Sequence, residues 1–95
     1  MPEMSFRVRW PDASEQLCYS PSSTTREFFT PGEAYPLNEF LERSRRALNL
    51  ASERVRQRYG YACSSAAAQL QQIEQIAARF AATPDARVTV QSFDD

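Results

Sequence analysis

Residues 58–66 read RYGYACSSA, and this stretch decides that the chain holds a pair of helices rather than one long helix. A helical pattern that begins at Leu37 runs into it. Gly60 stands where a left-handed residue ends many helices. A second helical pattern begins between Cys63 and Ser65. We therefore interpret the stretch as the corner of a helical hairpin.

Apolar residues recur at spacings of three and four on both sides of this corner, as on one face of a helix. The stripe of the first helix consists of Leu37, Leu41, Ser44, Leu48, Ala51, Val55 and Tyr59. We expect Tyr59, which ends this stripe, to lie in the core. The stripe of the second helix, which we expect to end at Thr83-Pro84, consists of Ala66, Leu70, Ile73, Ala77 and Phe80, widened by Ile76 and Ala81.

Extended patterns flank the two helices. Residues 4–10 alternate apolar and polar side chains, which is typical of a half-buried strand. Residues 11–14 have the composition of a turn, and residues 15–19 resume the extended pattern with Leu17 and Tyr19 on one face. The two runs predict a β-hairpin.

Residues 86–93 alternate again, with Val88 and Val90 predicted to face inward, and we expect this strand to pair with the first. The order strand, strand, helix, helix, strand indicates an α+β fold. We predict a small antiparallel sheet, made of the N-terminal hairpin and the C-terminal strand, covered by a two-helix hairpin. A length of 95 residues fits a single domain spanning residues 1–95.

The segment 20–36 is long for a structureless loop in a small domain. It contains a turn signal at residues 30–33 and allows a short third strand near residues 25–29. Its large side chains, Phe28, Phe29 and Tyr35, either close the open end of the core or line a ligand groove or protein interface.

The composition restricts the chemistry of the chain. It contains no His and no Lys, so all eleven basic residues are Arg. The side chain best suited to acid–base catalysis near neutral pH is therefore missing, as are lysine nucleophiles and histidine metal ligands. The two glycines stand too far apart to form a phosphate-binding loop. The residues do not indicate an enzyme, a metal site or a cofactor.

The two cysteines, Cys18 and Cys63, allow one alternative that uses chemistry. A thiol at a helix N-terminus can have a lowered pKa, so Cys63 is a candidate reactive or redox-sensing thiol, with Cys18 as a candidate partner. Against this, a free cysteine is often only a small buried residue. No base adjoins Cys63 in the sequence, and we favour the structural interpretation.

The first helix carries six arginines between positions 43 and 58. Its candidate interaction surface consists of Phe40, Leu50, Arg43, Arg46, Arg54 and Arg58, together with Phe28 and Phe29 of the loop. Such a surface suits a carboxylate-bearing partner, an anion or RNA. Nucleic acid is the weaker alternative, because the net charge of the chain is −1.

Four segments in a fixed order carry a family resemblance: MPEMSFRVRWPD, CYSPS, AYPLNEFLERSRRAL and ASERVRQRYGYACSSA. With them, nearly the whole chain resembles a small family of bacterial nitrogen-starvation response proteins. The resemblance implies a gene cluster with a nitrilase-type hydrolase, a radical-type enzyme, an acetyltransferase-like protein and a flavoprotein, linked to the use of nitriles or cyanide. It implies no catalytic residue.

Together these observations predict a non-enzymatic accessory or regulatory protein that binds a protein of the same pathway. Self-association into a homodimer through the first helix is compatible with this prediction. The beginning MPEMSFRVRW has no apolar signal segment, and no window is apolar enough to span a membrane. We therefore expect no membrane partner and a cytoplasmic protein with reduced thiols.

Overall fold

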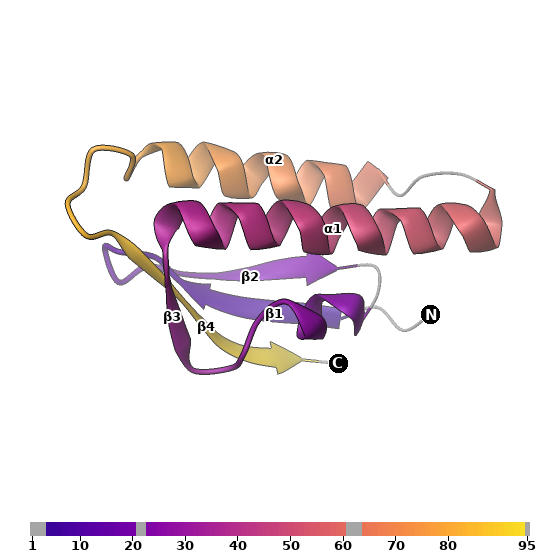
Figure 1. The fold of residues 1–95 in the computed structure, drawn as a ribbon, viewed down its shortest axis with the longest axis horizontal. Helices are drawn as coiled ribbons and strands as arrows, with labels where there is room; N and C mark the ends of the chain where they lie inside the picture. Colours follow the sequence, from indigo (N-terminus) through magenta and orange to yellow (C-terminus); the bar gives the residue numbers. More distant parts are fainter. Residues whose placement is uncertain (1–3, 21–22, 61–63, 95) are drawn as a thin grey trace.

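The computed structural model describes residues 4–20, 23–60 and 64–94, which form a sheet with two helices over one face (Figure 1). The elements in chain order are β1 (Met4–Arg9), β2 (Glu15–Ser20), the 3₁₀ helix η1 (Ser23–Glu27), β3 (Glu33–Pro36), α1 (Leu37–Tyr59), α2 (Ser64–Ala78) and β4 (Arg87–Asp94). The predicted α+β class and the order of the two helices and their flanking strands are confirmed. The elements η1 and β3 lie in the long loop.

The sheet is antiparallel, with the strand order β2-β1-β4-β3. In the ladder, Phe6 of β1 stands opposite Cys18 of β2 and opposite Phe93 of β4. The predicted hairpin is therefore confirmed, as is the pairing of the last strand with the first. The strands β2 and β3 form the two edges of the sheet.

A β-bulge changes which residues of β4 face the helices. The register shifts next to the pair Val8–Val90, which makes Gln91 an extra residue in β4. The extra residue lets Val90 and Phe93 both pack against the core, although they are three positions apart. Val88 and Val90 are fully buried, as the alternating pattern predicts.

The predicted third strand over residues 25–29 is wrong. Ser23–Glu27 form the 3₁₀ helix η1, and the extended segment comes later, as β3 over Glu33–Pro36. The hydroxyl of Thr25 donates a hydrogen bond to the Oγ of Ser20 at 2.6 Å, and both side chains are buried. This buried contact holds η1 against the end of β2, and the sequence pattern does not reveal it.

The turn predicted at residues 30–33 leads into β3. The backbone N–H of Glu33 donates to the carbonyl oxygen of Thr30 at 3.1 Å, and Gly32 has a φ of 86°. A positive φ at the third position of such a turn favours glycine. The N–H of Gly32 also donates to the carbonyl oxygen of Val90 at 2.6 Å, so the turn begins the pairing of β3 with β4.

Helix α1 begins and ends where the sequence predicts. Pro36 precedes it, and the N–H of Leu37 donates to the carbonyl oxygen of Ala86 at 3.1 Å. At the other end Gly60 has a φ of 83°, and its N–H donates to the carbonyl oxygen of Arg56 at 2.8 Å. Both ends therefore follow local signals, a proline at the start and a left-handed glycine at the stop.

The last two turns of α1, residues 52–59, extend past the sheet (Figure 1). No residue of α1 after Ala51 is buried. Tyr59, which we expected in the core, is 53% exposed, so that prediction is wrong. The reason is geometric: the helix is longer than the strands beneath it, and its periodic pattern continues past the end of the sheet. We call residues 52–59 the α1 tip.

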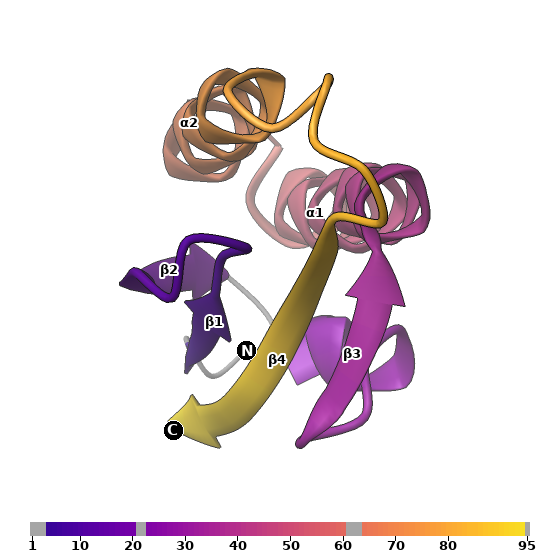
Figure 2. The same ribbon diagram turned by 90° about the vertical axis from the view of Figure 1, so that its left-hand side faces the viewer.

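Helix α2 ends at Ala78, earlier than the predicted stop at residues 83–84. Turns follow, and they carry Phe80 over Trp10, where the two rings stack with centroids 6.1 Å apart. The stripe of α2 buries Ala66, Ile73 and Ala77 against the rest of the core. Figure 2 shows the result end-on, with α2 on the β2 side and α1 on the side of β4 and β3.

Candidate functional site

The thiol of Cys18 lies in the core and not at the surface. Its side chain is fully buried between the sheet and the helices, and burial raises the pKa of Cys18 to about 12. The thiol therefore stays protonated near neutral pH and lacks the thiolate character of a nucleophile. Cys63 lies outside the described residues, so the alternative in which it acts with Cys18 stays a prediction.

Two aromatic residues of the predicted interaction surface are buried instead. Phe29 is 3% exposed and Phe40 is fully buried, with their ring centroids 5.5 Å apart. Phe29 also stacks on Phe6 at 6.0 Å. These rings close the end of the core that the loop covers, so neither can contact a partner. Phe28 is half-buried at the surface.

The first arginines of α1 are already engaged within the chain. Arg43 donates from Nη1 to the carbonyl oxygen of Phe28 at 2.7 Å, and its guanidinium lies 4.9 Å from the centroid of the Tyr35 ring. Arg46 forms an ion pair with Glu42 at 2.7 Å, one turn earlier. Arg43 thus ties the loop to α1, and Arg46 is neutralised locally.

The α1 tip carries a different set of side chains. Arg56 pairs with Glu53 at 2.6 Å, and this hydrogen bond lowers the pKa of Glu53. Within the described residues Arg54 and Arg58 form no ion pair, and the guanidinium of Arg58 lies 5.8 Å from the ring centroid of Tyr59. The positive charge of α1 that remains available is therefore concentrated at the tip.

Leu50, the remaining residue of the predicted surface, is half-buried and lies between the engaged part of α1 and the α1 tip. The structure thus separates the predicted set. Arg43 and Arg46 flank Phe28, and a small pocket of about 200 Å³ lies among them, Glu39 and Glu42. Arg54 and Arg58 lie further along the helix, on the α1 tip, where no residue is buried.

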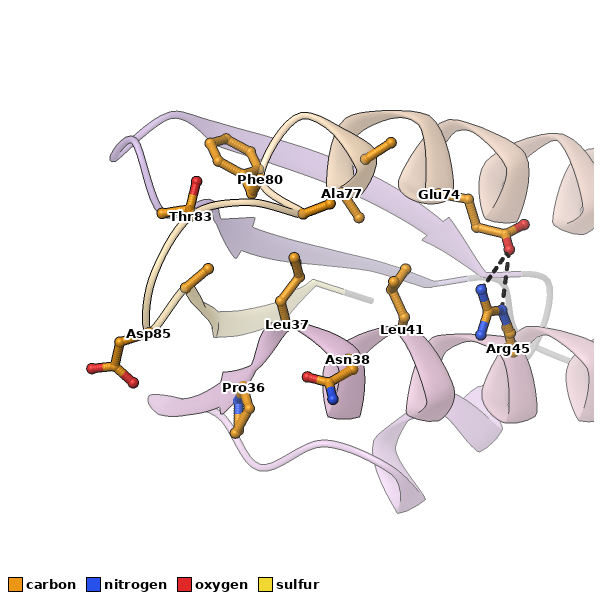
Figure 3. A pocket seen from close by; sticks show the side chains of 13 residues that line it. Pro36, Leu37, Asn38, Leu41, Arg45, Glu74, Ala77, Phe80, Thr83 and Asp85 are labelled. Atoms are coloured by element: carbon orange, nitrogen blue, oxygen red, sulfur yellow. Dashed lines mark hydrogen bonds and ion pairs between the residues drawn. The ribbon is translucent and has the colours of Figure 1, made fainter.

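A larger groove of about 570 Å³ opens where the start of α1 faces the end of α2 (Figure 3). Leu37 and Leu41 line it from α1, and Phe80 lines it from the turns after α2. At one end Arg45 donates two hydrogen bonds, at 3.1 and 3.0 Å, to one carboxylate oxygen of Glu74. Besides the apolar side chains and this ion pair, the lining includes the polar residues Asn38, Thr83 and Asp85.

The sequence did not reveal this groove. Leu37 and Leu41 belong to the apolar stripe predicted for the first helix, and both are partly buried against the core at the open end of the helix pair. The pair formed by Arg45 and Glu74 joins residues 29 positions apart, so it depends on how the helices pack. Only a way to match charged residues of one helix with those of the other could have indicated this ion pair.

Among the described residues, no group of three or more His, Cys, Asp or Glu side chains gathers in a way that could hold a metal ion. A search of the same residues finds no helix with the length and apolarity needed to cross a bilayer. The sequence contains no His, so the commonest metal ligand is missing from the whole chain.

Comparison with known proteins gives one match. A family model described as nitrogen starvation-induced protein NitG matches residues 5–93, which include every strand and both helices almost entirely. No curated protein sequence and no solved structure gives a significant match. The resemblance to nitrogen-starvation proteins is confirmed by this match, and the gene-cluster context stays a prediction.

Proposed function

This chain belongs to the family of the nitrogen starvation-induced protein NitG, and on that premise we propose that it is a non-enzymatic accessory or regulatory protein of a nitrogen-starvation response. It acts by binding an acidic surface of another protein with the α1 tip. The observation that carries this proposal is the exposure of Tyr59 beside Arg54 and Arg58 on a helix end that leaves the core.

The chemistry of the tip supports a protein partner. Tyr and Arg are enriched among the residues that dominate binding energy in protein interfaces. Arg54 and Arg58 have no ion pair within the described residues, so carboxylates of a partner would supply their counter-charges. An RNA partner fits less well, because the chain has a pI of about 5.4 and lacks the charge of a basic domain.

The thiol alternative now depends on Cys63 alone. Burial raises the pKa of Cys18 to about 12, which removes it as a ready nucleophile or resolving thiol. The composition further supports a binding role, since the chain has neither His nor Lys to assist a thiol.

From the family resemblance we further infer the kind of partner. The partner is an enzyme of the same pathway, one that serves the use of nitriles or cyanide under nitrogen limitation. The protein meets this partner in the cytoplasm, the compartment in which its two cysteines would stay reduced.

The test is affinity capture of the tagged full chain from nitrogen-starved cells, with partners identified by mass spectrometry. We expect one protein in stoichiometric amount, and we expect its capture to weaken as the salt concentration rises. The double variant Arg54→Glu, Arg58→Glu should reduce capture by about tenfold or more, because like charges facing each other oppose association.

A matched control reverses two exposed arginines elsewhere. Arg9 on β1 and Arg79 after α2 are exposed and lie away from the α1 tip. The double variant Arg9→Glu, Arg79→Glu makes the same change in net charge and should leave capture intact. Equal loss in both double variants, or no specific protein in nitrogen-starved cells, would contradict the proposal.

A further inference from the structure

The two edges of the sheet differ in how they are protected. The edge strand β3 has four residues, follows a tight turn and ends in Pro36. The edge strand β2 has six residues in an unbroken register with β1, and it contains no proline. Natural edge strands are usually blunted by shortness, proline, bulges or charge. Only β3 meets this expectation fully, and β2 is the open edge (Figure 2).

The backbone groups of β2 that face this edge can be assigned. The N–H of Tyr19 donates to Oε1 of Gln69 in α2 at 2.9 Å, so it points away from β1. Backbone direction alternates along an antiparallel strand, so the N–H and C=O of Leu17 also point to the open edge. The side chain of Leu17 is 55% exposed on the face away from the helices. The edge therefore joins a hydrogen-bonding backbone to an exposed aliphatic side chain.

The helix above this edge has an unusual surface. Of the fifteen residues of α2, only Glu74 is charged, and Arg45 of α1 already neutralises it. Beside Tyr19, a shallow groove of about 620 Å³ runs along α2, and its remaining lining consists of Ser65, Ala68, Gln69, Gln71, Gln72 and Gln75. Depletion of charge is a feature of interface cores.

We propose that the β2 edge and this glutamine surface of α2 form a two-fold interface with a second copy of the chain. In a two-fold interface each patch meets itself, so a charged patch repels its copy. A glutamine side chain is both donor and acceptor, so a glutamine patch is complementary to itself. The arginine-bearing surface of α1 lacks this property, so self-association through α1, with which the sequence is compatible, is the weaker arrangement.

The register follows from the strand. With the two-fold axis at Leu17, the two β2 strands run antiparallel, Leu17 meets Leu17 of the second copy, and Glu15 meets Tyr19. No charged residue then faces its own copy, and Glu15 keeps Arg7 of its own chain at 3.9 Å. The hydrogen bond from Tyr19 to Gln69 is exchanged for one across the strands, which frees Gln69 to pair with the other α2.

The proposed interface lies apart from the α1 tip. Both helices lie over the same face of the sheet. Helix α2 packs on β2 at one edge, whereas α1 packs on η1, β3 and β4 toward the other edge. A second copy on the β2 edge therefore leaves Arg54, Arg58 and Tyr59 open to another partner. Failure of the self-interface and failure of the proposed function are thus separate results.

The experiment measures the mass of the full chain in solution by sedimentation velocity across a wide concentration range, with native amide hydrogen exchange at both ends of the range. We expect the dimer mass at high concentration and protection of the Leu17 amide that is lost on dilution. A monomer at every concentration overturns the proposal, and so does a dimer whose Leu17 amide exchanges freely.

Two variants locate the interface. Leu17→Lys places a charge on the two-fold axis without touching the core and should weaken dimerisation by about tenfold or more. Ala34→Lys is the matched control on the other edge strand, at an exposed position, and should leave the dimer intact. A dimer that resists Leu17→Lys, or that dissociates equally with Ala34→Lys, overturns the proposed surface.

A second pair of variants tests the helix. Gln72→Glu with Gln75→Glu keeps the side-chain shape and introduces like charges that face their copies, so it should weaken the dimer to a similar extent. Gln57→Glu on α1 is exposed and should have no effect. A dimer unaffected by the two α2 changes excludes the glutamine surface. A partner protein or peptide that occupies β2 while the free chain stays monomeric overturns the self-interface in favour of strand addition.

Discussion

The two helices lie side by side on one face of the sheet, but they present opposite chemistry to their surroundings. Helix α1 carries nine charged side chains, three Glu and six Arg, whereas α2 carries only Glu74. Helix α1 places the ring of Phe40 in the core, and α2 contributes one isoleucine and two alanines. We infer that α1 is the anchor of the fold, because it buries the larger side chains and its charged residues face solvent. Helix α2 buries smaller side chains, and its nearly uncharged outer surface suits contact with neutral groups.

The largest expected effect tests α1 as the anchor. The ring of Phe40 packs edge-on against Trp10, which follows β1, and lies tilted against Phe29 of the loop, with ring centroids 5.5 Å apart in both pairs. Phe40→Ala should lower the free energy of unfolding by about 4 kcal/mol, from lost burial and the cavity that remains. Urea denaturation followed by circular dichroism measures this change.

The control lies on the same helix. Tyr59→Ala removes an aromatic ring from the exposed α1 tip, and it should change the free energy of unfolding by no more than about 0.5 kcal/mol. If Tyr59→Ala cost as much as Phe40→Ala, the tip would belong to the core. The division of α1 into an anchored part and a projecting tip would then be wrong.

The same division explains how far the sequence could predict the fold. Both ends of α1 depend on local signals, so Pro36 and Gly60 place them correctly. The spacing of apolar residues along a helix carries no information on how far the sheet beneath it extends. Tyr59 was therefore assigned to the core although it is exposed. Periodicity identifies which side of a helix is apolar, and tertiary packing decides how much of that side is covered.

The loop and the candidate site were less predictable for the same physical reason. The 3₁₀ helix η1 depends on the buried contact of Thr25 with Ser20, and the burial of Phe29 depends on rings from β1 and α1. Neither contact can be inferred from the spacing of apolar and polar residues in the sequence. Arg43 was predicted to belong to an interaction surface on α1, and its hydrogen bond to Phe28 could not be inferred without the path of the loop.

A second prediction tests how well α2 covers the sheet. Cys18 lies on β2, the strand on which α2 packs, and burial raises the pKa of its thiol from 9.0 to about 12. Between these values the unfolded chain loses the thiol proton while the folded chain keeps it, so stability is full below pH 9 and is lost as pH rises toward 12. The free energy of unfolding should fall by up to about 4 kcal/mol, since each pH unit in this range costs about 1.4 kcal/mol.

The thiol contribution is isolated by comparing the chain with Cys18→Ala. All other ionisable groups are present in both proteins, so the difference between the two stability curves above pH 9 reports Cys18. Native Cys18 should also resist a thiol reagent near neutral pH. Rapid labelling, or parallel stability curves, would mean that water reaches β2 beneath α2 and that the cover is looser than the structure indicates.

The smallest expected effect concerns the one charged contact between the helices. The side chains of Arg45 and Glu74 are 51% and 42% exposed, so solvent screens their ion pair. A double-mutant cycle with Arg45→Gln and Glu74→Gln should give a coupling of about 0.5 kcal/mol that decreases with salt. The pair Arg46–Glu42, within α1, is the matched control. A coupling of about 2 kcal/mol between the helices would contradict the view of α2 as a helix held by apolar packing. Helix α2 would then be held by charge and not by the burial of Ile73, Ala66 and Ala77.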